Sequence, residues 1–259
     1  MALTPPPHRK QANGGAGAAT IAVFSLKGGV GKTTLAVNLA WCAAAQSSRR
    51  TLLWDLDPQA ASTFLLGGET GRNVAQAVFA KDVAPAKLRT PTAIDRLWLL
   101  PADASLRGLD HFFFGLGKKK RMAKLIDDIG RDHDRIVLDC PPGLTETADQ
   151  AMRAASLILV PLIPSPLSRR ALDEVVAHLT REHGRHAPIL PVFTMVDRRR
   201  ALHLSALAEQ PDWPVVPMAS AIEAMAARRE PVGAFAPKSP ASEAFSSLWR
   251  GIERRLAQA

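Results

Sequence analysis

Residues 27–34 read Lys-Gly-Gly-Val-Gly-Lys-Thr-Thr, and this stretch decides the fold of the chain. An apolar run at residues 21–25 precedes it, and the apolar sequence TTLAVNLAWCAAA follows it. A strand, a glycine-rich turn and a helix in this order are the setting of a phosphate-binding loop, in which backbone N–H groups and the positive end of the helix surround a phosphate. The pattern predicts a nucleotide site formed by Gly28, Gly29, Val30, Gly31, Lys32, Thr33 and Thr34.

Two side chains of this loop have predicted chemical roles. Lys32 is placed to reach the β- and γ-phosphates, and the Thr33 hydroxyl is placed to bind Mg²⁺. The loop departs from the general phosphate-loop pattern at Leu26, because that pattern has glycine five positions before Gly31. The version that does fit, with Lys27 ahead of the glycines, is far more restrictive than the general one.

Two further apolar runs end in carboxylates. The first leads into the sequence DLDPQ, which contains Asp55 and Asp57, and the second ends in Asp139. Asp55 and Asp57 are two positions apart at the end of a strand, so both side chains point the same way, toward the loop beside them. A buried strand that ends in a carboxylate has the Walker-B arrangement, in which the carboxylate supports the Mg²⁺ shell. This pattern predicts that Asp139 belongs to the same site.

The loop and the DLDPQ segment resemble those of the deviant Walker-A ATPases, the family of ParA partition proteins and MinD, and the chain is closest to the small Soj-like members. The resemblance extends from about residue 19 to residue 256. It implies Mg²⁺-dependent ATP hydrolysis in a sandwich homodimer, with Lys27 reaching the partner's ATP. It also implies that Asp57 positions the attacking water and that Asp55 holds Mg²⁺ through a water molecule. No strong general base is evident near the loop, so we expect slow hydrolysis, with ATP acting as a timer for the dimer.

The resemblance also implies which residues contact the adenine. The segments FTMVD and VPM each end a predicted strand and are similar to family segments that line the base, which makes Met195, Asp197 and Pro217 the candidates. Strand ends commonly carry such residues merely to turn the chain, and this alternative stays open. Cys140 follows Asp139 in a Cys-Pro-Pro-Gly segment that resembles the family's switch, but a small buried cysteine needs no chemical role.

The rest of the chain alternates short apolar runs with helical patterns, which predicts an α/β fold with a doubly wound, mostly parallel sheet flanked by helices, the P-loop NTPase fold. We expect a basic, Pro-rich disordered tail over residues 1–18 and a single domain over residues 19–259. Residues 67–96 are the least readable part, and we expect a helical insertion over the sheet edge. The predicted strands are residues 21–25, 51–55, 97–101, 135–139, 157–162, 189–194 and 215–217.

Charge favours a polyanionic partner. Lys and Arg outnumber Asp and Glu by 33 to 24, a formal charge of +9, which suits nucleic acid or an anionic membrane. In ParA-type relatives the ATP dimer binds DNA non-specifically through basic clusters, and a ParB-like or adaptor protein activates hydrolysis. Charge runs also commonly form solvated helix faces, so both interpretations stay open. Ala221 stands where many small relatives carry arginine. The basic clusters are Lys118, Lys119, Lys120 and Arg121; Arg198, Arg199 and Arg200; Arg228 and Arg229; and Arg250, Arg254 and Arg255.

The main alternative is a membrane-associated positioning ATPase like MinD. The final helical pattern, residues 239–256, places Phe245, Leu248, Trp249 and Ile252 on one side and arginines opposite, as a lipid-surface helix does. We expect this helix to be buried against the sheet instead, because it is the last element of the domain. An orphan positioning ATPase for a non-DNA assembly is the other alternative.

Several other classes lack their signatures. The two cysteines, Cys42 and Cys140, are not spaced as CxxC, which argues against an iron–sulfur carrier, a zinc site or a disulfide framework, and no tyrosine is present for a tyrosine-kinase cluster. About 20 residues before the first strand are too few for a helix-turn-helix, although His8, Arg9 and Lys10 give the tail a basic character. We expect a cytoplasmic protein that associates with the nucleoid when ATP is bound.

Overall fold

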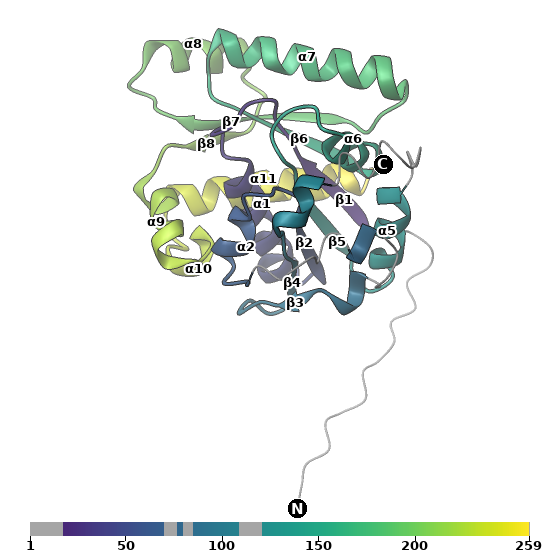
Figure 1. Cartoon of the computed structure of the whole chain (residues 1–259). Helices are drawn as coiled ribbons and strands as arrows, with labels where there is room; N and C mark the ends of the chain where they lie inside the picture. Colours follow the sequence, from purple (N-terminus) through teal and green to yellow (C-terminus); the bar gives the residue numbers. More distant parts are fainter. Residues whose placement is uncertain (1–17, 70–76, 80–84, 109–120, 259) are drawn as a thin grey trace, which may run out of the picture.

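One eight-stranded sheet forms the centre of the computed structural model, which describes residues 18–69, 77–79, 85–108 and 121–258. The strands are β1 (Ala19–Val23), β2 (Thr51–Asp55), β3 (Thr90–Pro91), β4 (Leu97–Leu100), β5 (Arg135–Asp139), β6 (Leu157–Leu162), β7 (Ile189–Val196) and β8 (Val215–Pro217). Their order is β3-β4-β2-β5-β1-β6-β7-β8, and only the edge pair β3–β4 is antiparallel (Figure 1). The predicted doubly wound, mostly parallel sheet is thus confirmed.

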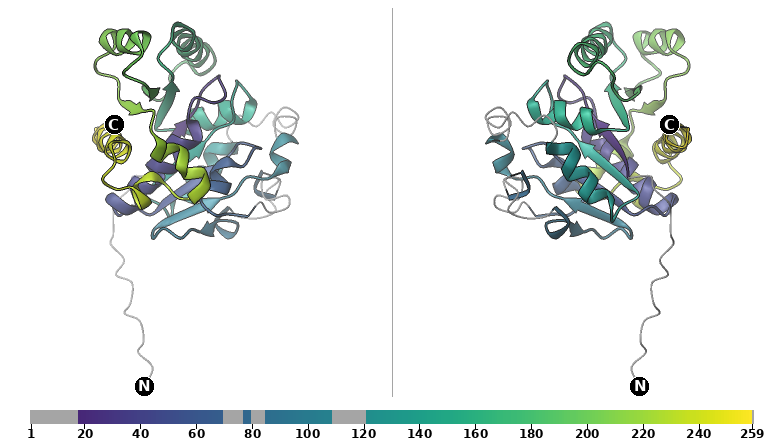
Figure 2. Two further views of the ribbon diagram at one scale, coloured as in Figure 1. Left: turned by 90° about the vertical axis from the view of Figure 1, so that its left-hand side faces the viewer. Right: turned by 90° about the vertical axis from the view of Figure 1, so that its right-hand side faces the viewer.

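Helices cover both faces of the sheet, because its central strands are apolar on both sides (Figure 2). Ile21 and Val23 pack into one apolar core, and Ala22 and Phe24 into the other, as the alternation of side chains along a strand requires. The first core is covered by α1 (Lys32–Trp41), α2 (Ala61–Leu65), α9 (Ser220–Arg228), α10 (Val232–Phe235) and α11 (Pro240–Leu256). The second core is covered by α5 (Arg121–Gly130), α6 (Glu146–Ala154), α7 (Pro166–His183) and α8 (Ala201–Glu209).

The segment at residues 67–96, predicted to be a helical insertion over the sheet edge, is not helical throughout. Its described end is a short 3-10 turn, Pro85–Lys87, followed by the edge strand β3. The ring of Phe79 stacks on Trp54 at a centroid distance of 5.7 Å, so this segment also contributes to the core. A two-residue strand containing a proline carries too little apolar pattern to be detected from sequence. Residues 70–76 and 80–84 lie outside the described part.

The final helix, α11, is part of the core. Ser239 accepts a hydrogen bond from the Ser242 amide at 3.1 Å and caps the helix ahead of a proline, as the sequence suggested. Phe245, Trp249 and Ile252 on its apolar side are at most 1% exposed. The expected burial against the sheet is confirmed, and the apolar stripe is not available to a lipid surface. Among the helices of the described residues, none is both long and apolar enough to span a bilayer.

Gly233 in α10 is a close-packing point against Trp41 at the end of α1, on the same face of the sheet. A Cβ atom there would lie 2.1–2.6 Å from three ring atoms of Trp41, which is closer than real Cβ atoms approach other heavy atoms. We predict that Gly233→Ala destabilises the fold by about 1–3 kcal/mol, because the bulky indole must move out of its place. Thermal unfolding measures the effect as a fall in Tm of roughly 3–10 °C.

Gly251→Ala in α11 is the matched control. The nearest atom to a Cβ at Gly251 is the Arg254 Nη2, 4.0 Å away, and alanine is the better helix former, so we expect an unchanged or higher Tm. Equal effects of the two substitutions would contradict the assignment of Gly233 as a packing point.

Candidate functional site

The glycine-rich loop connects β1 to α1 at the carboxyl ends of the central strands. Gly29 and Gly31 have φ angles of 71° and 88°, the left-handed conformation that glycine adopts without strain. Gly31 is the N-cap of α1, so the first amides of this helix face the concave side of the loop. The Thr194 hydroxyl of β7 donates to the Val30 carbonyl at 2.8 Å and ties the loop to the sheet. The loop is therefore pre-shaped to hold an anion.

Lys32 lies inside this loop. It is 7% exposed, and its Nζ donates to the Lys27 carbonyl oxygen at 3.3 Å, across the turn. Burial lowers the pKa of the Lys32 ammonium, and the negative charges of Asp139 and Asp57 act in the opposite direction. A buried cation next to carboxylates and backbone amides is suited to contact a polyanion. The Lys27 side chain is half-buried and forms no ion pair with any described residue.

Asp55 and Asp139 stand side by side at the ends of β2 and β5, where they are partners in the strand register. Both are fully buried. Burial raises the pKa of Asp55 and the charge of Asp139 adds to the rise; burial also raises the pKa of Asp139, against hydrogen bonds from Ser62 and Thr33. Two adjacent buried carboxylates repel each other unless a cation or proton lies between them.

The donor set fits a divalent cation. Asp139 Oδ1 is buried and has no hydrogen-bond partner in the described part of the chain, while its Oδ2 accepts from the Ser62 hydroxyl at 2.6 Å. Mg²⁺ prefers oxygen ligands and is bound in nucleotide sites by one or two carboxylates together with phosphate oxygens. Thr33, Asp55 and Asp139, the three predicted metal residues, are thus brought together around an unsatisfied oxygen.

Two residues that orient the carboxylates were not predicted. Ser62 binds Asp139, and the amide and hydroxyl of Thr63 both donate to Asp55 Oδ2 at 2.8 Å. Ala60 adopts a φ of 54°, which turns the chain so that α2 starts next to the two aspartates. The only signal in the sequence was the Ser-Thr pair shortly after the DLDPQ segment, and hydroxyl pairs are too common to carry an assignment.

Asp57 is half-buried on the rim of the same site. Its Oδ1 accepts from the Gln59 amide at 2.9 Å, which holds the side chain in place, and no residue that the structure describes donates to its other oxygen. Cys140 follows Asp139 and is fully buried, and burial raises the pKa of its thiol beyond the usual range. A neutral buried thiol is a poor nucleophile, which agrees with the absence of a chemical role for Cys140.

A mostly apolar pocket adjoins the loop on the side of β7 and β8. Met195 and Pro217 line it together with Gly31 and Thr34, and Met218, directly after β8, and Ile222 of α9 complete the lining. Met195 has a φ of 53°, an unusual conformation for a long side chain. The third predicted adenine residue, Asp197, does not line this pocket. It accepts from Arg199 Nε and Nη2 at 2.8 and 2.9 Å, and these hydrogen bonds lower the pKa of Asp197 to about 2.

The basic clusters differ in their surroundings. Arg198 and Arg200 are exposed at the start of α8. The Arg228 guanidinium lies 4.9 Å from the Phe235 ring centroid, and Arg229 lies 4.7 Å from that of Phe64. Arginines held against rings in this way still present their charge to solvent.

One member of the predicted clusters is not a surface residue. Arg121 is 8% exposed and donates to the carbonyl oxygens of Phe79 and Val78 at 3.2 and 2.9 Å, so its assignment to a surface cluster was wrong. Arg121 lies at the start of α5 and packs against the segment that ends at Phe79. A pattern of charges in the sequence does not indicate this contact. Lys118, Lys119 and Lys120, as well as His8, Arg9 and Lys10, lie outside the described residues.

Comparisons with known proteins agree with this geometry. A family model described as an AAA domain matches residues 18–189. The chain is 26% identical to the sporulation initiation inhibitor protein Soj of Bacillus subtilis, covering 90% of this chain and 97% of that protein. It is 30% identical to the chromosome-partitioning ATPase Soj of Thermus thermophilus, covering 92% and 97%. A Cyanothece McdA variant in complex with ATP has a similar fold, with a TM-score of 0.80 at 21% identity over 92% of this chain and 98% of that one.

Proposed function

The chain belongs to the ParA/MinD family as a Soj-like ATPase, and from this premise we propose that it is an ATP-dependent dimer switch that binds DNA non-specifically and partitions or positions a cargo. One observation carries the nucleotide part of the proposal. Lys32, Asp55 and Asp139 come from α1, β2 and β5 and meet at the carboxyl ends of adjacent strands. This arrangement binds a phosphate chain and a divalent cation together.

Hydrolysis in such a site depends on positioning and on charge. Thr33, Asp55 and Asp139 would hold Mg²⁺, which would supply positive charge to the phosphate chain. Lys32 neutralises the charge that develops on the γ-phosphate, and Lys27, unpaired among the described residues, reaches the ATP of the partner. Asp57 on the rim orients the attacking water. Without a strong base in the site, turnover is slow until an activating partner of the ParB or adaptor kind binds.

Two exposed basic segments form the proposed DNA surface. Arg198 and Arg200 follow the carboxyl end of β7, and Arg228 and Arg229 end the helix that follows the adjacent strand β8. The first segment therefore lies at the same edge of the sheet as the ATP site. The second is tied to α2, whose hydroxyls bind the carboxylates of that site, because Arg229 Nε donates to the Phe64 carbonyl at 3.0 Å. Non-specific DNA binding requires several such cations on one side and no reading of base edges. Dimerisation doubles the number of cations, so that DNA binding follows ATP, and the ATP form would be associated with the nucleoid in the cytoplasm.

The proposal is tested by binding to random-sequence duplex DNA and to anionic vesicles, with ATP, with ADP and without nucleotide. Asp57→Ala holds the protein in its ATP state during the measurement. We expect DNA binding only with ATP and a steep loss of affinity with salt. Vesicle binding without DNA binding would replace the proposal by a membrane-associated switch. Binding to neither would leave a positioning ATPase whose cargo is a protein assembly.

The DNA surface makes a separate prediction. Replacing Arg228 and Arg229 by glutamine should weaken DNA binding and flatten the plot of log affinity against log salt by about one unit for each lost phosphate contact. The control removes the same charge elsewhere, at Arg131 and Arg107, which are exposed beyond α5 and in the turn Ala104–Gly108. A slope unchanged by the first pair, or lowered equally by the control pair, would place the DNA surface elsewhere.

A further inference from the structure

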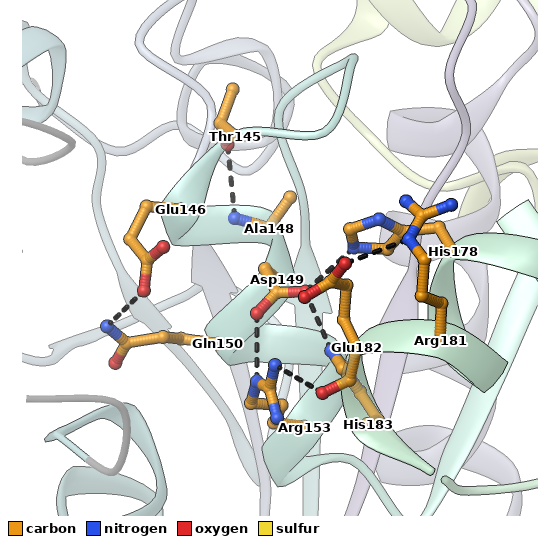
Figure 3. Close-up of polar contacts among 10 residues, drawn as sticks. All are labelled: Thr145, Glu146, Ala148, Asp149, Gln150, Arg153, His178, Arg181, Glu182 and His183. Atoms are coloured by element: carbon orange, nitrogen blue, oxygen red, sulfur yellow. Dashed lines mark hydrogen bonds and ion pairs between the residues drawn. The ribbon is translucent and has the colours of Figure 1, made fainter. Parts of the chain in front are cut away.

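Three metal-binding side chains converge between α6 and α7, outside the ATP site (Figure 3). Asp149 lies in the middle of α6, and His178 and His183 lie on the last turns of α7. Figure 3 shows both imidazole rings directed at the Asp149 carboxylate. One donor atom from each of the three residues lies within 4.8 Å of the other two. No residue proposed for ATP binding or hydrolysis belongs to this cluster.

The distances in the cluster match those between the ligands of a bound transition metal. His178 Nε2 and His183 Nε2 lie 2.9 and 2.7 Å from the same oxygen, Asp149 Oδ1. An ion bound at about 2.0–2.1 Å by nitrogen and oxygen holds neighbouring ligand atoms about 2.9 Å apart in octahedral geometry and about 3.3 Å apart in tetrahedral geometry. The two nitrogen–oxygen distances therefore need to lengthen by no more than about half an ångström to accommodate an ion.

We propose that Asp149, His178 and His183 form a binding site for a divalent transition metal ion, of which Zn²⁺ is the type, that joins α6 to α7. Two imidazoles and one carboxylate suit Zn²⁺, Co²⁺, Ni²⁺ or Cu²⁺, whereas Mg²⁺ and Ca²⁺ prefer oxygen ligands only. Three protein ligands leave at least one position for water. The inference concerns a second site, so it holds or fails independently of the ATP-dependent function.

The carboxylate is already oriented for this role. Arg153 Nε donates to Asp149 Oδ2 at 2.8 Å, and its Nη2 donates to the Glu182 carbonyl at 3.1 Å, so one arginine ties the carboxylate to the end of α7. Oδ2 is thereby occupied and Oδ1 is left to face the two imidazoles. Hydrogen bonds of this kind to the non-ligating oxygen are what fixes a metal-binding carboxylate.

The two histidines can take up an ion without breaking other contacts. In the metal-free arrangement each Nε2–H group donates a hydrogen bond to Asp149 Oδ1. An ion binds to Nε2 only after its proton has left or moved to Nδ1. His183 Nδ1 is buried without a hydrogen-bond partner in the described part of the chain, so no contact there holds the ring in its present tautomer. The His183 side chain is 3% exposed, yet a cleft lined by Arg153, His183, Arg185 and His186 opens beside it and gives an ion access.

The test uses the full chain, purified without a polyhistidine tag, stripped with a chelator and titrated with Co²⁺ and Zn²⁺. Excess Mg²⁺ and the absence of nucleotide keep the oxygen-rich ATP site from competing. We expect one Co²⁺ per chain, visible by its d–d absorption bands, and displacement of this ion by Zn²⁺. A rise in Tm of several degrees with saturating Zn²⁺ should accompany binding. Failure of Co²⁺ and Zn²⁺ to bind at micromolar concentration would overturn the proposal.

Variants assign the site. His178→Gln should weaken Zn²⁺ binding by more than about tenfold and abolish the Co²⁺ spectrum. Removing a residue that only hydrogen-bonds to a ligand already costs about tenfold or more, and loss of a ligand itself costs more than that. His178 is 14% exposed and is a safer choice than the nearly buried His183. His186→Gln is the control, since His186 lines the same cleft without belonging to the cluster. Binding of a fluorescent ATP analogue reports that each variant is folded. Equal Zn²⁺ affinity of His178→Gln and the unaltered chain would refute the assignment, as would an equal loss in His186→Gln.

Discussion

Lys32→Ala should abolish nucleotide binding, with a loss of ATP affinity of at least about 100-fold. The ammonium is 7% exposed and lies within the turn, so its contact with a phosphate is shielded from water. Truncating one partner of a buried charge pair costs about 2–5 kcal/mol, and 2.7 kcal/mol already corresponds to 100-fold. The substitution also removes a positive charge that interacts with the carboxylates of Asp139 and Asp57. Titration with a fluorescent ATP analogue measures the affinity.

Lys27→Ala is the matched control for this experiment. It removes an ammonium from the same loop, but one that makes no ion pair within the described residues and that, in the proposed mechanism, reaches the partner's ATP. We expect ATP affinity within about threefold of the unaltered chain, together with a loss of ATP-dependent dimerisation measured by light scattering. Unchanged ATP affinity in Lys32→Ala would refute the phosphate-loop assignment.

Asp57→Ala should reduce ATP hydrolysis by about 100-fold or more while nucleotide binding persists. The Asp57 carboxylate is held by the Gln59 amide through one oxygen and keeps the other open on the rim of the site. Groups that position a nucleophile or accept its proton contribute roughly 10²–10⁴ to the rate. Because hydrolysis ends the ATP state, the variant should accumulate as an ATP-bound dimer. Phosphate release and the mass of the protein with ATP measure the two effects.

Asp95→Ala controls for the loss of a carboxylate as such. Asp95 has a 93% exposed side chain paired with its neighbour Arg96, just ahead of β4 and outside the acidic pair. We expect its hydrolysis rate to match that of the unaltered chain. If Asp57→Ala also turned over at that rate, Asp57 would have no part in the mechanism.

The sequence predicted the central sheet well because each of its strands carries its own signal. The strands at residues 51–55, 135–139, 157–162 and 215–217 agree with β2, β5, β6 and β8 to the residue. Continuous apolar runs mark strands buried on both faces, and the glycines with left-handed φ angles mark the loop. The edge strand β3 was missed, since an exposed pair that includes Pro91 has no such pattern.

The residues of the candidate site that belong to a sequence motif could be predicted. The residues that contact them from other parts of the chain could not. Asp55 and Asp139 are 84 positions apart, yet each ends an apolar strand, so their meeting at one sheet edge followed from the fold. The hydroxyls of Ser62 and Thr63 reach them only because α2 starts beside the ends of β2 and β5. Asp197 accepts hydrogen bonds from Arg199, two residues away, a contact that the resemblance did not indicate.

By itself, the sequence determined the phosphate loop, the parallel strands and the positions of the carboxylates, because each depends on contacts within a few residues or on the regular geometry of a strand. Only the tertiary structure decided the burial of Arg121 and the convergence of Asp149 with His178 and His183, which lie 29 and 34 residues away. Such contacts are set by how helices pack on a common sheet. The rotation of one helix against another depends on the whole core, and no local pattern records it.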